Sequence, residues 1–136
     1  MAGMLKLEII TPDGTLLSEQ VESITLSGAD GELTILPGHA RLMTQLAPGE
    51  MLLCQGGQNR LLAVGQGLAF VKSDSVSIAT DMAIPAENID EAKAEEARQR
   101  AAAQLREKVS SEEVASVNAS LARALAQLNV KRRSRK

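Results

Sequence analysis

The chain has few residues that could perform chemistry. It has one histidine, His39, and one cysteine, Cys54, and no paired carboxylates at helical spacing beside a base. A nucleophile needs such a base to be activated. Gly65-Gln-Gly67 lacks the third glycine of a dinucleotide loop, and the apolar run Met51–Cys54 predicts a buried, inert thiol. We therefore expect a chain that is not an enzyme and holds neither a metal ion nor an obligatory cofactor.

The polar residues with the most defined setting lie between Gly31 and Leu42. Asp30-Gly31 favours a tight turn, a short alternating strand follows, and Pro37-Gly38 ends that strand. This pattern predicts one stiff loop at a sheet edge that carries both Glu32 and His39. A stiff loop suits docking, because it loses little entropy on binding. The alternatives are an ordinary turn carboxylate and a hydrogen-bonded structural histidine.

The elements before this stretch and after it, up to about residue 80, have the pattern of strands. Leu5–Ile9 and Ser75–Ala79 alternate apolar and polar residues, and Gly56–Asn59 is typical of a hairpin turn. Another strand is expected over Val21–Ser27, with a bulge because Val21 is out of phase with the other apolar residues. Turn signals recur roughly every 8 to 12 residues, which predicts a β-sandwich or barrel.

The composition changes after Pro85. From Ala86 to Lys108 the chain has neither glycine nor proline and is rich in Ala, Glu, Arg and Gln, which predicts a helix. Asn88 is the expected N-cap, with Glu91 three residues later. Ser110–Glu113 breaks this helix and caps a second one.

The two predicted helices carry apolar stripes suited to an antiparallel hairpin. The stripe residues are Ala94, Ala97, Ala101 and Leu105 in the first helix and Val114, Val117, Leu121, Leu125 and Leu128 in the second. Little apolar surface remains for the β domain once the stripes face each other. We expect a weakly docked, movable hairpin; the alternative is a permanently packed helical cap.

Composition and charge narrow the function classes. The apolar content of 44% over 136 residues is enough for a core, while Phe70 is the only aromatic residue, so no stacking platform for bases is expected. The first residues lack an apolar run of signal-peptide length and no later run approaches a membrane span, which with the single thiol predicts a cytoplasmic chain.

The charge is polarised along the chain. The net charge is −2, but Lys131–Lys136 holds five cations and leaves −7 on the rest. Such a tail is either solvated or meets acidic protein, nucleic acid or phospholipid. One functional alternative is therefore a free-standing β-sandwich adaptor whose tail binds nucleic acid or anionic lipid.

Four stretches together resemble the epsilon subunit of the rotary proton-translocating ATP synthase, of bacterial type, over essentially the whole chain. They are Leu7-Glu-Ile-Ile-Thr-Pro-Asp-Gly14, Gly31-Glu-Leu-Thr-Ile-Leu-Pro-Gly-His-Ala40, Leu46-Ala-Pro-Gly49 and Ile89-Asp-Glu-Ala-Lys-Ala94. The resemblance implies a ten-stranded β-sandwich over residues 1–85 and an antiparallel two-helix hairpin over residues 86–136. It also implies a non-catalytic rotor subunit, peripheral on the cytoplasmic face of the bacterial plasma membrane.

The resemblance implies partners as well. The sandwich would touch the gamma subunit and the polar loops of the c-ring, through Gly31, Glu32, Pro37, Gly38 and His39. The hairpin would either fold down on the sandwich or extend along gamma to the catalytic beta (and alpha) subunits and inhibit ATP hydrolysis. Nucleic acid is not an expected partner. The cations that match the inhibitory contact with an acidic segment of beta are Arg123, Lys131, Arg132 and Arg133.

Some bacterial members of the family also bind regulatory ATP on the folded hairpin. The residues that match this site are Ile89, Asp90, Lys93, Ala94, Arg100 and Arg123. Lys93 stands where the family motif has arginine, and lysine lacks the planar fork that binds phosphate in a bidentate manner. Ile84 and Gln127 replace an acidic and a basic residue of the motif. The alternative is that Asp90 and Lys93 are only first-turn helix surface.

Overall fold

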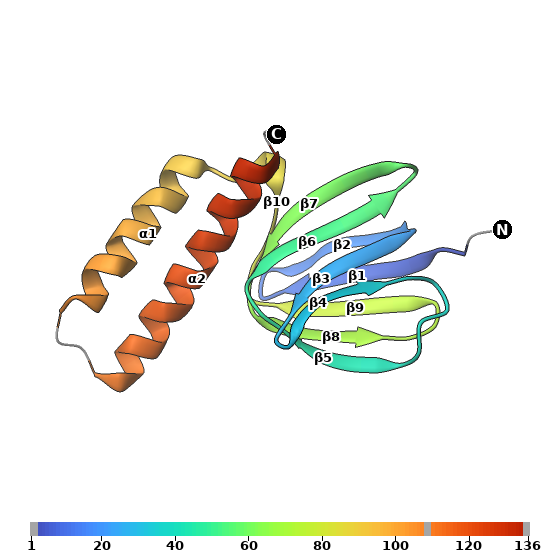
Figure 1. Cartoon of the computed structure of the whole chain (residues 1–136), viewed down its shortest axis with the longest axis horizontal. Helices are drawn as coiled ribbons and strands as arrows, with labels where there is room; N and C mark the ends of the chain where they lie inside the picture. The colour runs from blue at the N-terminus through green and yellow to red at the C-terminus, as the bar shows by residue number, and fades with distance from the viewer. Residues whose placement is uncertain (1–2, 108–109, 135–136) are drawn as a thin grey trace.

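Ten strands precede the first helix in the computed structural model of the chain, which describes residues 3–107 and 110–134 (Figure 1). The strands are β1 (Leu5–Thr11), β2 (Gly14–Val21), β3 (Ser23–Gly28), β4 (Gly31–Ile35), β5 (Leu42–Leu46), β6 (Gly49–Gln55), β7 (Gln58–Val64), β8 (Gly67–Val71), β9 (Ser75–Thr80) and β10 (Ala83–Pro85). The helical part comprises a 3-10 turn (Ala86–Asn88), α1 (Glu91–Leu105) and α2 (Ser111–Ser134).

The strands form two layers that share a core. One layer runs β10-β7-β6-β3-β4 and the other β2-β1-β9-β8-β5, and the two meet where Gly28 of β3 pairs with Leu46 of β5. Neighbours are antiparallel except β1 and β9, which pair in parallel. Across the other seam, Arg60 Nη1 of β7 donates to Glu19 Oε2 of β2 at 2.7 Å. The predicted ten-stranded sandwich is confirmed.

Alternation along the strands separates the core from the surface. On β1, Leu5, Leu7 and Ile9 are fully buried, whereas Ile10 is 40% exposed. The register with β2 shifts between Ile9 and Ile10, which places the bulge there and not at Val21 as predicted. Val21 is buried, ends β2 and pairs with Leu5. Sequence analysis merged it into the next strand because β2 does not alternate in a regular way.

The helix starts differ in part from the prediction. Asp90, not Asn88, caps α1, since the backbone N–H of Lys93 donates to Asp90 Oδ1 at 3.1 Å, and Asn88 ends the 3-10 turn. The predicted cap of α2 is confirmed, because the N–H of Glu113 donates to Ser110 Oγ at 3.2 Å. Lys108, the predicted end of the first helix, lies outside the described residues. No helix in the described ranges has the length and apolar character needed to cross a membrane.

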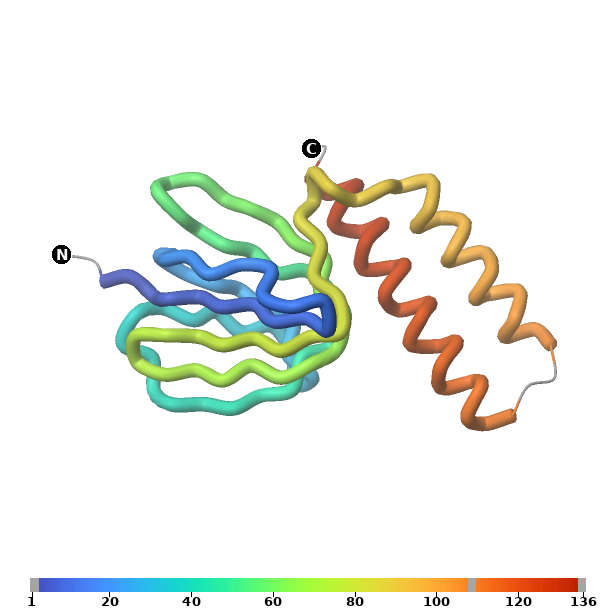
Figure 2. Tube along the Cα trace, turned by 180° about the vertical axis from the view of Figure 1, so that it is seen from behind, coloured from blue at the N-terminus to red at the C-terminus, as the bar shows by residue number. Residues whose placement is uncertain are grey.

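Helix α2 lies between α1 and the sandwich, and only its C-terminal half approaches the strands (Figures 1 and 2). A small set of buried residues, here called the docking cluster, joins α2 to the sandwich: Ala63, Ala86, Ile89, Ala126 and Val130. The partly buried side chains of Leu61, Met82 and Ile84 pack against this cluster. Leu125, predicted to face α1, is 40% exposed and lies beside the sandwich instead. The predicted thiol burial is also incomplete, since Cys54 is only half-buried.

The two neighbouring isoleucines of β1 provide a stability test. We expect Ile9→Val to lower the free energy of unfolding by about 1 kcal/mol, because it removes a buried methylene from a filled core. Ile10→Val, the control on the exposed face, should leave stability almost unchanged. Urea unfolding of the full chain measures both. Equal losses from both variants would contradict the burial pattern.

Candidate docking and regulatory sites

Glu32 and His39 lie at opposite ends of β4, not on one loop as predicted. Four residue steps along this strand span about 13 Å, with Gly31 and Glu32 at the end near the helices and Pro37 to His39 beyond the other end. The sequence pattern predicted the strand correctly but did not show that it separates the two groups. The edge position is confirmed, since β4 pairs with β3 and with no other strand in the described part of the chain. The two residues therefore belong to two different surfaces.

His39 belongs to a tightly bonded turn. The N–H of Gly38 donates to the carbonyl of Ser73 at 2.7 Å, and the N–H of His39 donates to that of Leu36 at 3.2 Å. His39 Nδ1 lies 2.7 Å from the carbonyl oxygen of Ala40 and donates to it as the Nδ1–H tautomer. The half-buried imidazole thus has a structural role in addition to any contact with a partner.

The sequence did not predict a second surface, which is apolar and exposed. Four large apolar side chains are exposed on the outer face of β1, β5 and β8, here called the apolar strip: Ile10, Met43, Leu68 and Phe70, with exposed fractions of 40%, 64%, 37% and 43%. Met43 and Phe70 are a cross-strand pair, and Ala79 lies between Leu68 and Ile10 in the register. The available signal was β8, whose sequence places apolar residues on both faces, as in a strand covered on both sides.

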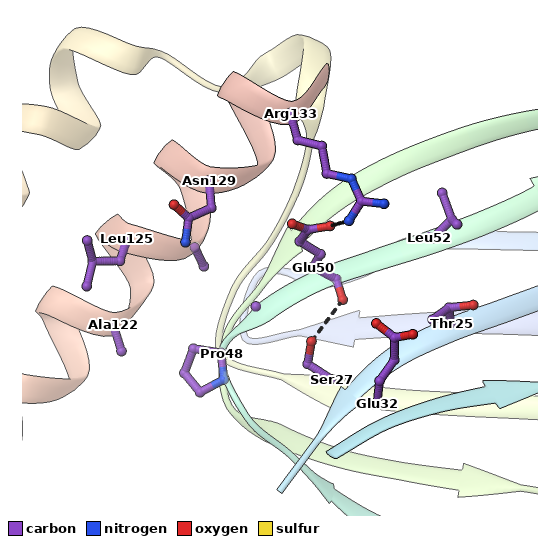
Figure 3. A pocket seen from close by; sticks show the side chains of 12 residues that line it. Thr25, Ser27, Glu32, Pro48, Glu50, Leu52, Ala122, Leu125, Asn129 and Arg133 are labelled. Atoms are coloured by element: carbon purple, nitrogen blue, oxygen red, sulfur yellow. Dashed lines mark hydrogen bonds and ion pairs between the residues drawn. The ribbon is translucent and has the colours of Figure 1, made fainter. Parts of the chain in front are cut away.

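A groove of about 530 Å³ separates α2 from β3 and β6 (Figure 3). Leu125 and Asn129 line it from the helix, and Glu32 lines it from β4. Arg133 forms an ion pair with Glu50 at its upper rim, and Ser27 Oγ donates to the backbone carbonyl of Glu50 at 3.4 Å. Glu32 forms no ion pair with any residue in the described ranges, so this carboxylate is available to a partner.

All four cations matched to the inhibitory contact have partners within the chain. Arg133 pairs with Glu50, and Arg123 Nη1 lies 3.2 Å from Asp81 Oδ2. Arg132 lies 3.5 Å from Glu91 and 3.8 Å from Glu95 across the hairpin, which shows that the end of α2 meets the start of α1. Lys131 Nζ donates to the carbonyl of Ala86 at 3.2 Å. The remaining tail residues, Arg135 and Lys136, lie outside the described residues.

The residues matched to a nucleotide site fall into two groups. Arg100 and Arg123 line a pocket of about 260 Å³ between the helices, with Gln104, Ser120 and Gln127. The others lie around the start of α1: Ile89 is buried in the docking cluster, Asp90 caps the helix, Ala94 is buried and Lys93 is exposed. The structure therefore unites the two arginines but not the full predicted set.

The hairpin surface also contains a perturbed carboxylate. The hydrogen bond from Arg98 lowers the pKa of Glu95, and Arg132 on the other helix adds a smaller effect in the same direction. The charged form of Glu95 is thus favoured where the two helices meet. In the described residues, no group of three or more His, Cys, Asp or Glu side chains could hold a metal ion.

Comparison with known proteins gives a consistent family. The family model described as the ATP synthase delta/epsilon chain β-sandwich domain matches residues 4–86, and the long α-helix domain of the same family matches residues 87–132. An ATP synthase epsilon chain from Dehalococcoides mccartyi is 41% identical over 97% of this chain and 95% of the relative. Another, from Hydrogenovibrio crunogenus, is 35% identical over 94% and 89%.

Solved structures agree with these sequence matches. A chain of the Euglena gracilis mitochondrial ATP synthase, solved as an OSCP/F1/c-ring assembly, superimposes with a TM-score of 0.79 at 27% identity, over 95% of this chain and 81% of that one. A chain of the Tetrahymena thermophila central stalk and c-ring shares the fold, with a TM-score of 0.57 at 12% identity, over 97% and 96%.

The sandwich and the appended hairpin define a protein of two parts, a β-sandwich domain followed by a long-helix domain. The matches over both parts make the assignment specific: the chain belongs to the ATP synthase delta/epsilon chain family, and its relatives are epsilon chains.

Proposed function

We propose that this chain is a central-stalk subunit of a proton-translocating ATP synthase, in which the sandwich couples the catalytic head to the c-ring through gamma and the hairpin inhibits ATP hydrolysis. The observation that carries the proposal is the contrast between two cores. In the described residues the sandwich core has sixteen buried side chains, whereas the docking cluster has five, two of them on α2. A fixed module with a lightly attached hairpin suits both tasks.

The apolar strip supports a permanent partner for the sandwich. Four large apolar side chains on one sheet face are costly to leave in water and suit burial in a protein interface. We assign this face, together with the Pro37–His39 turn at its end, to gamma. Gly31 and Glu32 at the opposite end of β4 are assigned to the polar loops of the c-ring, because the Glu32 carboxylate is exposed and unpaired in the described ranges.

The chain acts in the complex without a catalytic site of its own. Its cations on α2 would contact the acidic segment of the catalytic beta subunit, with alpha nearby, when the hairpin extends. Residues 1–85 and 86–136 then work as separate docking and regulatory domains. The bacterial relatives support a peripheral position on the cytoplasmic face of the plasma membrane, as part of the synthase.

The pocket between the helices favours regulatory ATP as a second activity. Two guanidinium groups, Arg100 and Arg123, face one cavity with three polar side chains, which suits a phosphate chain. ATP bound there would bridge α1 and α2 and hold the hairpin folded. Lys93, on the exposed first turn of α1, would contribute less than the two arginines.

The apolar strip should provide most of the affinity of the chain for gamma. We expect Met43→Asp and Phe70→Asp each to weaken binding to gamma at least tenfold, because each buries a charge in an apolar interface. Leu125→Asp, at a similarly exposed apolar position on the hairpin, is the matched control and should bind normally. Biosensor titration of the full chain against gamma measures this. Normal binding by both strip variants would contradict the assignment.

Removal of the hairpin should separate attachment from inhibition. An epsilon-depleted synthase reconstituted with the chain lacking residues 87–136 should keep proton coupling and hydrolyse ATP faster than with the full chain. Steady-state ATPase assays and proton pumping in vesicles measure the two properties. If the shortened chain still inhibits as strongly as the full one, the inhibitory element lies in the sandwich.

Calorimetry tests the nucleotide site. The full chain should bind ATP with measurable heat, Arg100→Ala should lose most of that binding, and Lys93→Ala should retain more of it. Glu96→Ala, on the exposed side of α1, serves as the control. Absence of heat with the unmodified chain denies the site.

A further inference from the structure

We propose that Glu50 and Asp81 keep the hairpin folded on the sandwich through their ion pairs with arginines of α2, and we call these two ion pairs the clasp. In the folded state the pairs neutralise the arginines that inhibit hydrolysis in the extended state. This inference rests on the proposed function and assigns a regulatory role to two sandwich carboxylates. Each would act as a positioning residue: it contacts no nucleotide or catalytic group and acts only through its arginine on α2.

In the first ion pair of the clasp, Asp81 is closely surrounded by other groups of the sandwich. Asp81 follows β9, and its N–H donates to the carbonyl of Gln66 at 3.2 Å. Its carboxylate lies so close to Gly65 that a Cβ there would be 1.9 Å from Oδ1, so a larger residue at position 65 would displace the carboxylate. Arg123 reaches this carboxylate while also donating to Ser120 Oγ at 3.2 Å. Both partners of this ion pair thus have further contacts within their own part of the chain.

The Glu50 half is built on β6. Glu50 pairs with Ala63 in the strand register, and its own carbonyl accepts the hydrogen bond from Ser27, which fixes the backbone at the rim of the groove. Its side chain leans toward Arg133 from the sandwich side, as Figure 3 shows. Ala63 itself belongs to the docking cluster, so this half of the clasp lies directly beside the apolar contact.

The two ion pairs lie at the two ends of the segment of α2 that contacts the sandwich. Arg133 lies ten positions after Arg123, which is about 15 Å along a helix, and Ala126 and Val130 of the docking cluster lie between them. An ion pair at each end and a small apolar contact in the middle fix both the position and the rotation of the helix. Exposed pairs of this kind are weak and screened by salt, which suits a reversible attachment.

The clasp predicts opposite effects for the two members of each pair. Loss of a carboxylate frees an arginine and releases the hairpin, so inhibition should increase. Loss of the arginine also releases the hairpin but removes the inhibitory contact, so inhibition should decrease. A purely structural ion pair would instead give the same effect from either side, since both changes break the same contact.

Docking can be measured on the full isolated chain. In a Cys54→Ser background, spin labels at Ser116→Cys on α2 and Asn59→Cys on the sandwich report folded and released hairpins as two distance populations. We expect Glu50→Gln and Asp81→Asn each to raise the released-to-folded ratio roughly twofold to fivefold. Glu19→Gln is the matched control, because Glu19 also pairs with an arginine and has a similar exposed fraction, 35% against 28% for Glu50 and 32% for Asp81.

Inhibition is then measured in the reconstituted synthase. Glu50→Gln and Asp81→Asn should inhibit hydrolysis more than the unmodified chain, and Arg123→Gln and Arg133→Gln should inhibit less. The exchange of Glu50→Arg with Arg133→Glu should restore docking of the isolated chain without restoring inhibition. This exchange separates the clasp from the inhibitory contact, which needs the positive charge on α2.

Two results would overturn the clasp. One is an unchanged released-to-folded ratio in both carboxylate variants; the other is weaker inhibition by the carboxylate variants, in the same direction as the arginine variants. If the unmodified chain does not inhibit at all, the proposed function fails, and the spin-label ratios still show separately whether Glu50 and Asp81 hold the hairpin.

Discussion

The attachment of α2 to the sandwich through the docking cluster is the contact on which the rest of the structure depends. Among the described residues, Ala126 and Val130 meet Ala63, Ala86 and Ile89 in a cluster of five buried side chains, against sixteen in the sandwich core. The free energy of burial scales with the apolar area removed from water, so the smaller cluster contributes less. The contact is sufficient to orient the helix but adds little to a sandwich that has its own complete core. A hairpin attached in this way can be regulated by weak forces, such as exposed ion pairs.

The proposed assignments place the attachment surface and the regulatory hairpin close together. Glu32, the carboxylate assigned to the c-ring, lines the same groove as Arg133 and Asn129 of α2. The end of the sandwich that faces the helices is thus also the end that would meet the rotor ring. The apolar strip and the His39 turn instead use the outer sheet face and the far end. Under the proposed assignments, one small module would present separate surfaces to separate partners.

Much of the fold could be predicted from local patterns, while the site depended on long-range geometry. Strand alternation, the turn residues and the break after Pro85 gave the sandwich and two helices. The pattern around Gly31 to Leu42 could not show that β4 separates Glu32 from His39, and helical spacing could not show that Leu125 faces the sandwich. The apolar strip was missed because exposure depends on which sheet face remains uncovered. The pairing of Arg123 with Asp81 joins residues 42 positions apart, beyond any local pattern.

The most direct test of a lightly attached, inhibitory hairpin is a reversible covalent lock across the docking cluster. In a Cys54→Ser background, Ala63→Cys and Val130→Cys would be joined by a short reagent that alkylates a thiol at each end and has a disulfide in its spacer. ATP hydrolysis by the reconstituted synthase would be measured before and after a reductant cleaves that disulfide. The account predicts fast, uninhibited hydrolysis while the lock is closed and inhibition once it is cleaved. Equal inhibition in both states would contradict it, because the hairpin would then inhibit without leaving the sandwich.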